Sequence, residues 1–298
     1  MTITSGDASS APEQLGLPGM PTRLFSCTPT RLTTWLDCPR RYRFTYLDRP
    51  PPPKGPPWAH NSLGSSIHLA LAGWHRLDAR ERSVEAAGRL LERAWLRDGF
   101  RDDEQAAACK SRAREMVMRY VATLDPDVEP LGVERTVGMR TEVLAVSGRL
   151  DRLDLRDGPD GEVLVVVDYK TGRRDLNVFD ARSSLALALY ALAAGRTFRR
   201  DCVRVELHHV PSGEVISHEH TAESLQRHLA RAESIGAEAG AADSAFRNGL
   251  SSAEADELFP TQVSPSCRFC DFVRWCPAGF AAHTPADPWV AVTVDGYL

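Results

Sequence analysis

Asp168 and Lys170 follow the most apolar stretch of the chain and are spaced so that they can act together. Residues 163–167 read Val-Leu-Val-Val-Val, and such a β-branched run predicts a strand buried on both faces. Side chains two positions apart on a strand point the same way, so we expect the carboxylate and the ammonium to project together. The chain has only two other lysines, Lys54 and Lys110, and a lysine can shift its pKa for proton transfer as an arginine cannot. The alternative is an ordinary ion pair at the end of a strand.

A second carboxylate, Asp151, lies on the segment before the valine run. Residues 146–155 alternate apolar and polar side chains, and residues 157–161 read Asp-Gly-Pro-Asp-Gly. This pattern predicts an antiparallel hairpin with the valine strand, which would place Asp151 across from Asp168. Two carboxylates beside a lysine favour a hard divalent ion, Mg²⁺ or Mn²⁺.

These residues also form recognisable motifs. Gly148 to Asp151 reads G-x-x-D, and Asp168 to Lys170 reads D-x-K after the hairpin turn. This order resembles the PD-(D/E)XK nuclease superfamily, and its RecB-like branch more closely. The resemblance implies an α/β fold with a restriction-endonuclease-like core, in which a central mixed β-sheet is flanked by helices.

The same branch carries G-x-x-x-H on a helix before the sheet, and Gly64 to His68 fits that spacing. Without the resemblance, His68 would be read as a core histidine, since it lies among apolar residues. The resemblance also implies that Lys170 orients or deprotonates the attacking water. The metal ligands that it implies are His68, Asp151, Asp168 and the backbone carbonyl of Tyr169.

The predicted apolar helix 180–194 carries a further motif in part. RecB-like enzymes have Q-x-x-x-Y here, with both side chains facing DNA; Tyr190 fits, but the glutamine position holds Ala186. This departure supports an alternative function, a catalytically weak DNA-end-binding subunit of a repair or CRISPR-adaptation complex. On the predicted strand 131–143, Glu134 is expected to be a surface acid; the alternative, which the resemblance implies, is a place near the metal, where acids at this point sometimes lie in the family.

The cysteines indicate a second site. Residues 267–276 read C-x₂-C-x₅-C, one thiolate short of a tetrahedral set, and Cys27, Cys38 and Cys202 are candidates for the fourth. RecB-like nucleases with an iron–sulfur clasp have C-P-x-x-[FY] before the core, as residues 38–42 do. Zn²⁺ is the alternative for four cysteines. The resemblance implies a [4Fe–4S] cluster held by Cys38, Cys267, Cys270 and Cys276.

Helices are expected to flank these motifs. Thr28-Pro29 predicts a helix start, and Cys38-Pro39 is expected to break that helix. Arg40 and Arg41 follow the break and are candidates for DNA phosphate contacts, although a solvated face is the common role of such residues. The other predicted helices are about 64–79, two amphipathic helices within 83–124, and 221–248, and a second hairpin joins 203–210 to 214–220.

Bulk composition limits the class of protein. The chain has 298 residues, 43% of them hydrophobic, and a net charge of −4, as expected for one large domain. It has no apolar run of membrane-spanning length and no signal-peptide pattern in its Ser/Pro/Gly-rich first 24 residues, so we expect a cytoplasmic protein without a membrane partner. Its seven cysteines would then bind metal or remain buried thiols.

The chain is expected to divide into three parts. They are a disordered tail 1–25, a nuclease domain 26–280 and a C-terminal tail 281–298. The nuclease domain is expected to contain a helical insertion 73–128 and a clasp formed by residue 38 and residues 267–276.

The resemblance implies a metal-dependent DNA nuclease, expected to be an exonuclease on single strands or ends in DNA repair or recombination. The sequence has no G-x-x-x-x-G-K-[ST] loop, so a helicase would be a separate partner. Besides the end-binding alternative, a zinc-stabilised protein without a nucleic-acid role remains possible on the residues alone.

Overall fold

The computed structural model describes residues 24–158 and 161–292. Most of the predicted N-terminal tail, the tip of the predicted hairpin turn and residues 293–298 lie outside the described residues. The last residue of the predicted tail, Phe25, begins a strand that runs to Cys27. Within the predicted C-terminal tail, Val292 is fully buried, and its carbonyl accepts a hydrogen bond from Gln105 Nε2 at 3.1 Å. Residues 281–292 are therefore partly packed against the domain.

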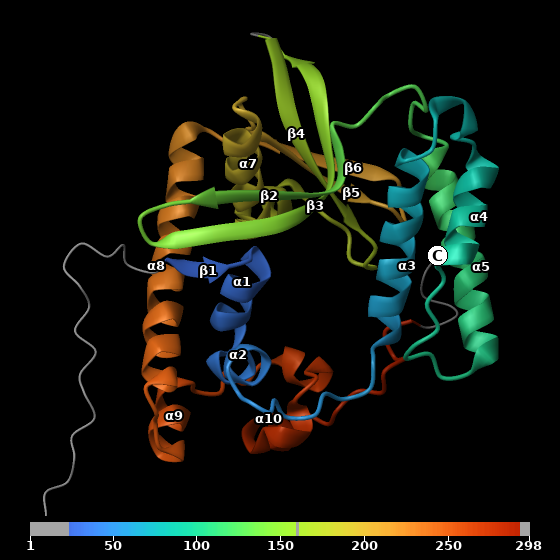
Figure 1. The fold of residues 1–298 in the computed structure, drawn as a ribbon. Helices are drawn as coiled ribbons and strands as arrows, with labels where there is room; N and C mark the ends of the chain where they lie inside the picture. The colour runs from blue at the N-terminus through green and yellow to red at the C-terminus, as the bar shows by residue number, and fades with distance from the viewer. Residues whose placement is uncertain (1–23, 159–160, 293–298) are drawn as a thin grey trace, which may run out of the picture.

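A mixed β-sheet forms the centre of the described structure (Figure 1). Its order is β1-β3-β4-β5-β6, with β2 paired to β3. β1 and β3 are parallel, as are β4 and β5, and the other neighbours are antiparallel. The expected central mixed sheet is thus confirmed. The strands are β1 (Phe25–Cys27), β2 (Gly132–Arg140), β3 (Leu144–Gly158), β4 (Gly161–Lys170), β5 (Arg204–His209) and β6 (Glu214–Glu219).

Helices cover both sides of this sheet: α3, α4 and α5 lie on one side and α7 and α8 on the other (Figure 1). None of the described helices is both long and apolar enough to cross a membrane. The helices are α1 (Pro29–Asp37), α2 (Pro39–Tyr46), α3 (Ala59–His75), α4 (Val84–Ala94), α5 (Asp103–Val121), α6 (Val178–Ser183), α7 (Leu185–Phe198), α8 (Ala222–Arg247), α9 (Ser252–Leu258) and α10 (Pro277–Ala282).

The helix break at Cys38-Pro39 is confirmed. Cys38 is extended and ends α1, and Pro39 is the first residue of α2, where its missing N–H costs nothing. The prediction for α3 was less accurate: the helix begins five residues before Gly64, at Ala59, and ends at His75 rather than near residue 79. Trp58 at its N-cap makes no side-chain cap hydrogen bond, so the usual sequence signal for a helix start is missing.

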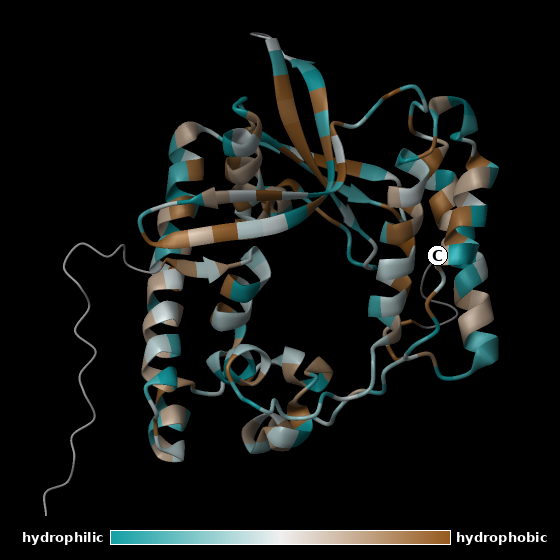
Figure 2. Cartoon of the chain, viewed as in Figure 1, coloured by the Kyte–Doolittle hydropathy of each residue, from teal (hydrophilic) through white to brown (hydrophobic). Residues whose placement is uncertain are grey.

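The valine strand lies between two hydrophobic clusters, as its composition predicts. Leu164 and Val166 belong to the cluster under α7 and α8, while Val165 and Val167 belong to the one under α3 and α5. All four side chains are fully buried, which stabilises the fold by about 1.5–3 kcal/mol each. Figure 2 shows the resulting apolar band along β4. A strand held this firmly on both faces is a rigid support for the polar residues at its end.

Candidate active site

Three side chains from three elements meet at one point beside the sheet. His68 comes from α3, Glu134 from β2 and Asp151 from β3. His68 Nδ1 lies 3.2 Å from Asp151 Oδ1, and one ligand atom from each of the three residues lies within 4.8 Å of the others. An imidazole with two carboxylates is a donor set that can hold a divalent metal ion.

The surface role expected for Glu134 was wrong. Its side chain is only 15% exposed, and its carboxylate pairs with Arg149 Nε at 2.8 Å. Val133 pairs with Arg152 and Arg135 with Leu150 across β2 and β3, so Glu134 lies between these pairs, opposite Asp151. Its φ of 51° is in the left-handed region, which is uncommon for a residue with a side chain. Such backbone strain often accompanies a functional site. The left-handed conformation of Glu134 leaves no local sequence pattern, so it is seen only once β2 is paired with β3.

Asp168 and Lys170 project together, as predicted from their spacing. Lys170 Nζ lies 2.6 Å from Asp168 Oδ2. The last pair of the hairpin ladder joins Arg152 to Val167, and the next step brings Asp151 opposite Asp168. Burial raises the pKa of Asp168, the Lys170 ammonium lowers it, and the Asp151 carboxylate raises it further, with a net upward shift. Asp168 therefore lies beside the three-residue set, with its carboxylate directed to the lysine.

The charge around His68 reflects this convergence. Burial lowers the pKa of His68, but the hydrogen bond to Asp151 and the negative charges of Asp151, Asp168 and Glu134 outweigh it, so the pKa is raised overall. All three carboxylates are thus within electrostatic reach of one imidazole. The site concentrates negative charge, which a divalent cation would neutralise.

Tyr169 connects this site to the opposite face of the sheet. Its backbone N–H donates to Asp151 Oδ2 at 2.8 Å. Its phenol points the other way, where the oxygen lies 3.1 Å from His75 Nε2 and accepts a hydrogen bond from Arg152 Nη1 at 3.2 Å. Arg152 in turn donates to Asp154 Oδ2 at 3.0 Å. The position of Asp151 therefore depends on a strand residue that is anchored in a buried polar network.

Tyr190 on α7 closes the site from the side opposite α3. Burial raises the pKa of its phenol, and the charges of Asp168 and Asp151 raise it further, so the phenol is within electrostatic reach of both carboxylates. A Cβ at Gly148 would lie 2.4 Å from Cε1 of the Tyr190 ring. The glycine of the G-x-x-D motif thus leaves the room that the Tyr190 ring occupies. Tyr190 lies four residues after Ala186 on the same helix.

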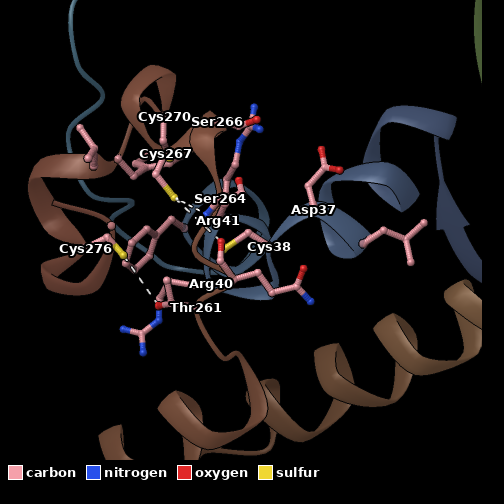
Figure 3. Close-up of a pocket in the computed structure, with 16 residues that line it drawn as sticks. Asp37, Cys38, Arg40, Arg41, Thr261, Ser264, Ser266, Cys267, Cys270 and Cys276 are labelled. Atoms are coloured by element: carbon pink, nitrogen blue, oxygen red, sulfur yellow. Dashed lines mark hydrogen bonds between the residues drawn. The ribbon is translucent and has the colours of Figure 1, made fainter. Parts of the chain in front are cut away.

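The four cysteines of the predicted clasp line one cavity of about 390 Å³ (Figure 3). Cys38 is the N-cap of α2, whereas the other three come from residues 267–276, which are far away in sequence. Cys27 and Cys202 are instead buried in the core cluster under the sheet, so they are not the fourth member. The lining of the cavity includes Gly279, where a Cβ would lie 3.4 Å from Cys276 Sγ and 3.6 Å from Cys267 Sγ. A Cβ at that position would be in ordinary van der Waals contact with two of the thiols, so Gly279 lies directly against them.

Arg40 and Arg41 also line the cysteine cavity, and both are shown there in Figure 3. Arg40 Nη2 pairs with Asp256 Oδ1 at 3.0 Å, and its Nε donates to the Phe259 carbonyl at 3.3 Å. The guanidinium of Arg40 therefore ties α2 to the α9 region. A DNA phosphate at Arg40 would compete with this ion pair.

The chain is similar to known proteins over most of its length. The sequence model of the PD-(D/E)XK nuclease superfamily matches residues 26–277. A 63-residue segment is 32% identical to an ATP-dependent helicase/deoxyribonuclease subunit of Clostridium tetani (strain Massachusetts / E88). That segment is 21% of this chain and 5% of the relative, so the chain matches a small part of that protein's length.

Proposed function

Because this chain belongs to the PD-(D/E)XK nuclease superfamily, we propose that it is a metal-dependent DNA nuclease of the RecB-like branch. Its substrates in this proposal are single strands or DNA ends, degraded exonucleolytically in repair or recombination. The observation that carries the proposal is the convergence of an imidazole, three carboxylates and an ammonium from α3, β2, β3 and β4. A protein that only bound DNA would not need this set.

Nucleases of this superfamily use divalent metals, and the donors present here fit Mg²⁺ or Mn²⁺. In the proposal His68, Glu134 and Asp151 hold the ion, with Asp168 and the Tyr169 carbonyl completing the set. A divalent ion at this position would polarise the scissile phosphate and lower the pKa of a water molecule. The concentration of carboxylates around His68, whose charges also raise the pKa of its imidazole, supports this assignment.

Lys170 is the residue proposed to act on the water. Its ammonium is held by Asp168 at 2.6 Å, which fixes its position at the end of the rigid strand. There it can orient the attacking water and offset negative charge that develops on the phosphate. Tyr190, held against Gly148 on the opposite side, is proposed to contact the DNA strand.

For the cysteine cavity we propose a [4Fe–4S] cluster with a structural role. A tetrahedral zinc site with Zn–S bonds of about 2.3 Å places its sulfurs roughly 3.8 Å apart. Among the described residues, no three of these four sulfurs lie within 4.8 Å of one another. A cavity of about 390 Å³ between them has room for a larger cluster. Anaerobically purified protein should be brown with a broad absorption band near ~400 nm, and colourless protein containing zinc would contradict this assignment.

The decisive experiment for nuclease activity uses end-labelled single-stranded and double-stranded DNA with and without Mg²⁺ or Mn²⁺. We expect metal-dependent shortening of the labelled strand, and we expect Lys170→Ala and Asp151→Ala to abolish it while DNA binding survives. Lys110→Ala, which changes a lysine on α5, is the matched control and should cleave at the parent rate. If both site variants also cleave at that rate, the assignment of the site is wrong.

The same assay separates the second candidate function. Ala186 replaces the glutamine expected four residues before Tyr190, which favours a weakly catalytic DNA-end-binding subunit. Tight binding of DNA ends by the parent protein without cleavage in Mn²⁺ would support that candidate. In either case a helicase partner is proposed, since the Clostridium tetani relative is described as an ATP-dependent helicase/deoxyribonuclease subunit.

A further inference from the structure

We propose that Phe179, on the first turn of α6, stacks on a base of a single-stranded DNA end as the strand enters the active site. This inference rests on the proposed nuclease function, because it names how the same site would hold its substrate. Phe179 is 70% exposed, the highest value among the large hydrophobic residues that the structure describes, and its neighbour Val178 is 55% exposed. Isolated exposed apolar residues are common on proteins, so the proposal depends on where this pair lies and on what surrounds it.

The helix α6 lies on the face of the sheet from which the catalytic groups project. Ala181 of α6 is fully buried in the same core cluster as Leu164 and Val166 of β4. Because side chains alternate along a strand, Asp168 and Lys170 project on the side of Val166. Phe179 therefore stands on a helix that packs against β5 and β6, the strands that follow β4 in the sheet, on the face from which Asp168 and Lys170 project.

The segment between Lys170 and Phe179 is anchored at both ends. The Gly172 carbonyl lies 2.8 Å from His209 Nε2, at the end of β5. At the other end, Asn177 Oδ1 accepts from the backbone N–H of Phe179 at 2.9 Å, and Asp180 Oδ2 accepts from the N–H of Asn177 at 2.9 Å. This reciprocal capping box holds the backbone of Phe179 in place. The exposed ring is thus presented on a fixed backbone, which reduces the entropy lost when a ligand stacks on it.

The charges around the ring suit a nucleic acid. Arg174 is paired with Asp180 at 2.8 Å, but Arg173 and Arg182 are exposed and form no ion pair with a carboxylate within residues 24–158 and 161–292. Arg173 lies six residues before Phe179 and Arg182 three residues after it. An exposed aromatic ring together with unpaired guanidiniums on one segment is a combination by which proteins hold single strands, since bases stack on the ring and phosphates meet the cations. A single-stranded end offers free base faces, whereas the bases of an intact duplex are already stacked on one another.

A fluorescence experiment tests the contact without relying on cleavage. The protein carries Lys170→Ala, to prevent cleavage, together with Phe179→Trp, and Lys170→Ala alone supplies the background of the native tryptophans. In Ca²⁺, we expect oligothymidylate to quench the new tryptophan and a base-free deoxyribose-phosphate oligomer of equal length to leave it unchanged. No change with either oligomer, or an equal change with both, would overturn the proposal.

Kinetics of the otherwise native protein provide the second test. Loss of one stacking contact should raise the KM of Phe179→Ala for a single-stranded oligonucleotide about tenfold with kcat unchanged, and Phe179→Tyr should restore it. Phe280→Ala, which removes a 54% exposed phenylalanine from α10, is the control and should behave as the parent. An unchanged KM in Phe179→Ala, or an equal rise for blunt duplex DNA, refutes the single-strand contact. If the tryptophan is quenched but the parent cleaves no DNA in Mg²⁺ or Mn²⁺, the nuclease proposal fails and the base contact stands.

Discussion

Gly148 and Tyr190 are packed so closely that a Cβ on the glycine would lie 2.4 Å from Cε1 of the tyrosine ring. The two residues come from β3 and α7, and the phenol of Tyr190 is within electrostatic reach of the carboxylates of Asp151 and Asp168. Because position 148 has no side chain, the phenol of Tyr190 can lie against it. Gly148 is three residues before Asp151, a proposed metal ligand. The glycine of G-x-x-D acts here through space and not through backbone flexibility.

Gly148→Ala should displace the Tyr190 ring and lower kcat about tenfold or more, since small shifts of positioning groups are costly in catalysis. We also expect overpacking to reduce the free energy of unfolding by about 1–3 kcal/mol. Gly138→Ala is the matched control, because its Cβ would make ordinary contact at 3.4 Å with the Val146 carbonyl. In the double variant Gly148→Ala/Tyr190→Ala the stability loss should be relieved, and a purely additive loss in chemical denaturation would show that the two residues are not in conflict.

Glu134→Ala should weaken Mn²⁺ binding about tenfold or more, the range seen when groups that support a metal are removed. The reason is that Glu134 offers a ligand atom within 4.8 Å of those of His68 and Asp151. Calorimetry or electron paramagnetic resonance of Mn²⁺ measures this without DNA. Glu142→Ala, at an exposed turn position, is the control, and equal Mn²⁺ affinity in both variants would remove Glu134 from the site.

Tyr169→Phe and Tyr120→Phe form a matched pair in the buried network on the opposite face. The first leaves His75 and Arg152 without the phenol, and the second removes the Tyr120 hydroxyl, which lies 2.6 Å from His208 Nδ1. Each should lower the free energy of unfolding by about 1–3 kcal/mol. Only Tyr169→Phe should also weaken Mn²⁺ binding, because the phenol contacts anchor the residue whose backbone N–H holds Asp151. If Mn²⁺ affinity is equally unchanged in both, the network does not position the site.

His75 should make the protein less stable as the pH falls below about 6.5, the ordinary pKa of histidine. Burial, helped by the Arg152 charge, lowers the pKa of His75 in the folded protein to about 3. Between these values the unfolded chain binds a proton that the folded protein does not, so lowering the pH favours unfolding by up to about 1.4 kcal/mol per pH unit. His75→Gln should flatten this dependence when urea unfolding is measured at pH 7, 6 and 5. Parallel curves for parent and variant would exclude His75 as the cause.

Much of the fold and part of the site could be predicted because they depend on short-range patterns. The valine run determines a doubly buried strand, since burial on both faces selects apolar β-branched residues. Two-residue spacing places Asp168 and Lys170 on one side, and the turn cluster after β3 sets the hairpin that brings Asp151 opposite Asp168. α1 ends before Pro39, because proline has no backbone N–H for a bond inside a helix. The three closely spaced cysteines also indicate the clasp segment, because their spacing is itself a local pattern.

The other features of the site depend on contacts between segments that are distant in the sequence. The place of Glu134 beside His68 and Asp151 depends on the register of β2 against β3 and on a left-handed backbone angle, neither of which leaves a local sequence pattern. The pairing of Arg40 with Asp256 and the exclusion of Cys27 and Cys202 from the cysteine cavity are likewise contacts between distant segments. The sequence by itself determined which side chains each strand and helix presents. Only the tertiary structure decided which of them meet, because the distance between two side chains on different elements is set by the packing of the whole core and not by the residues beside them.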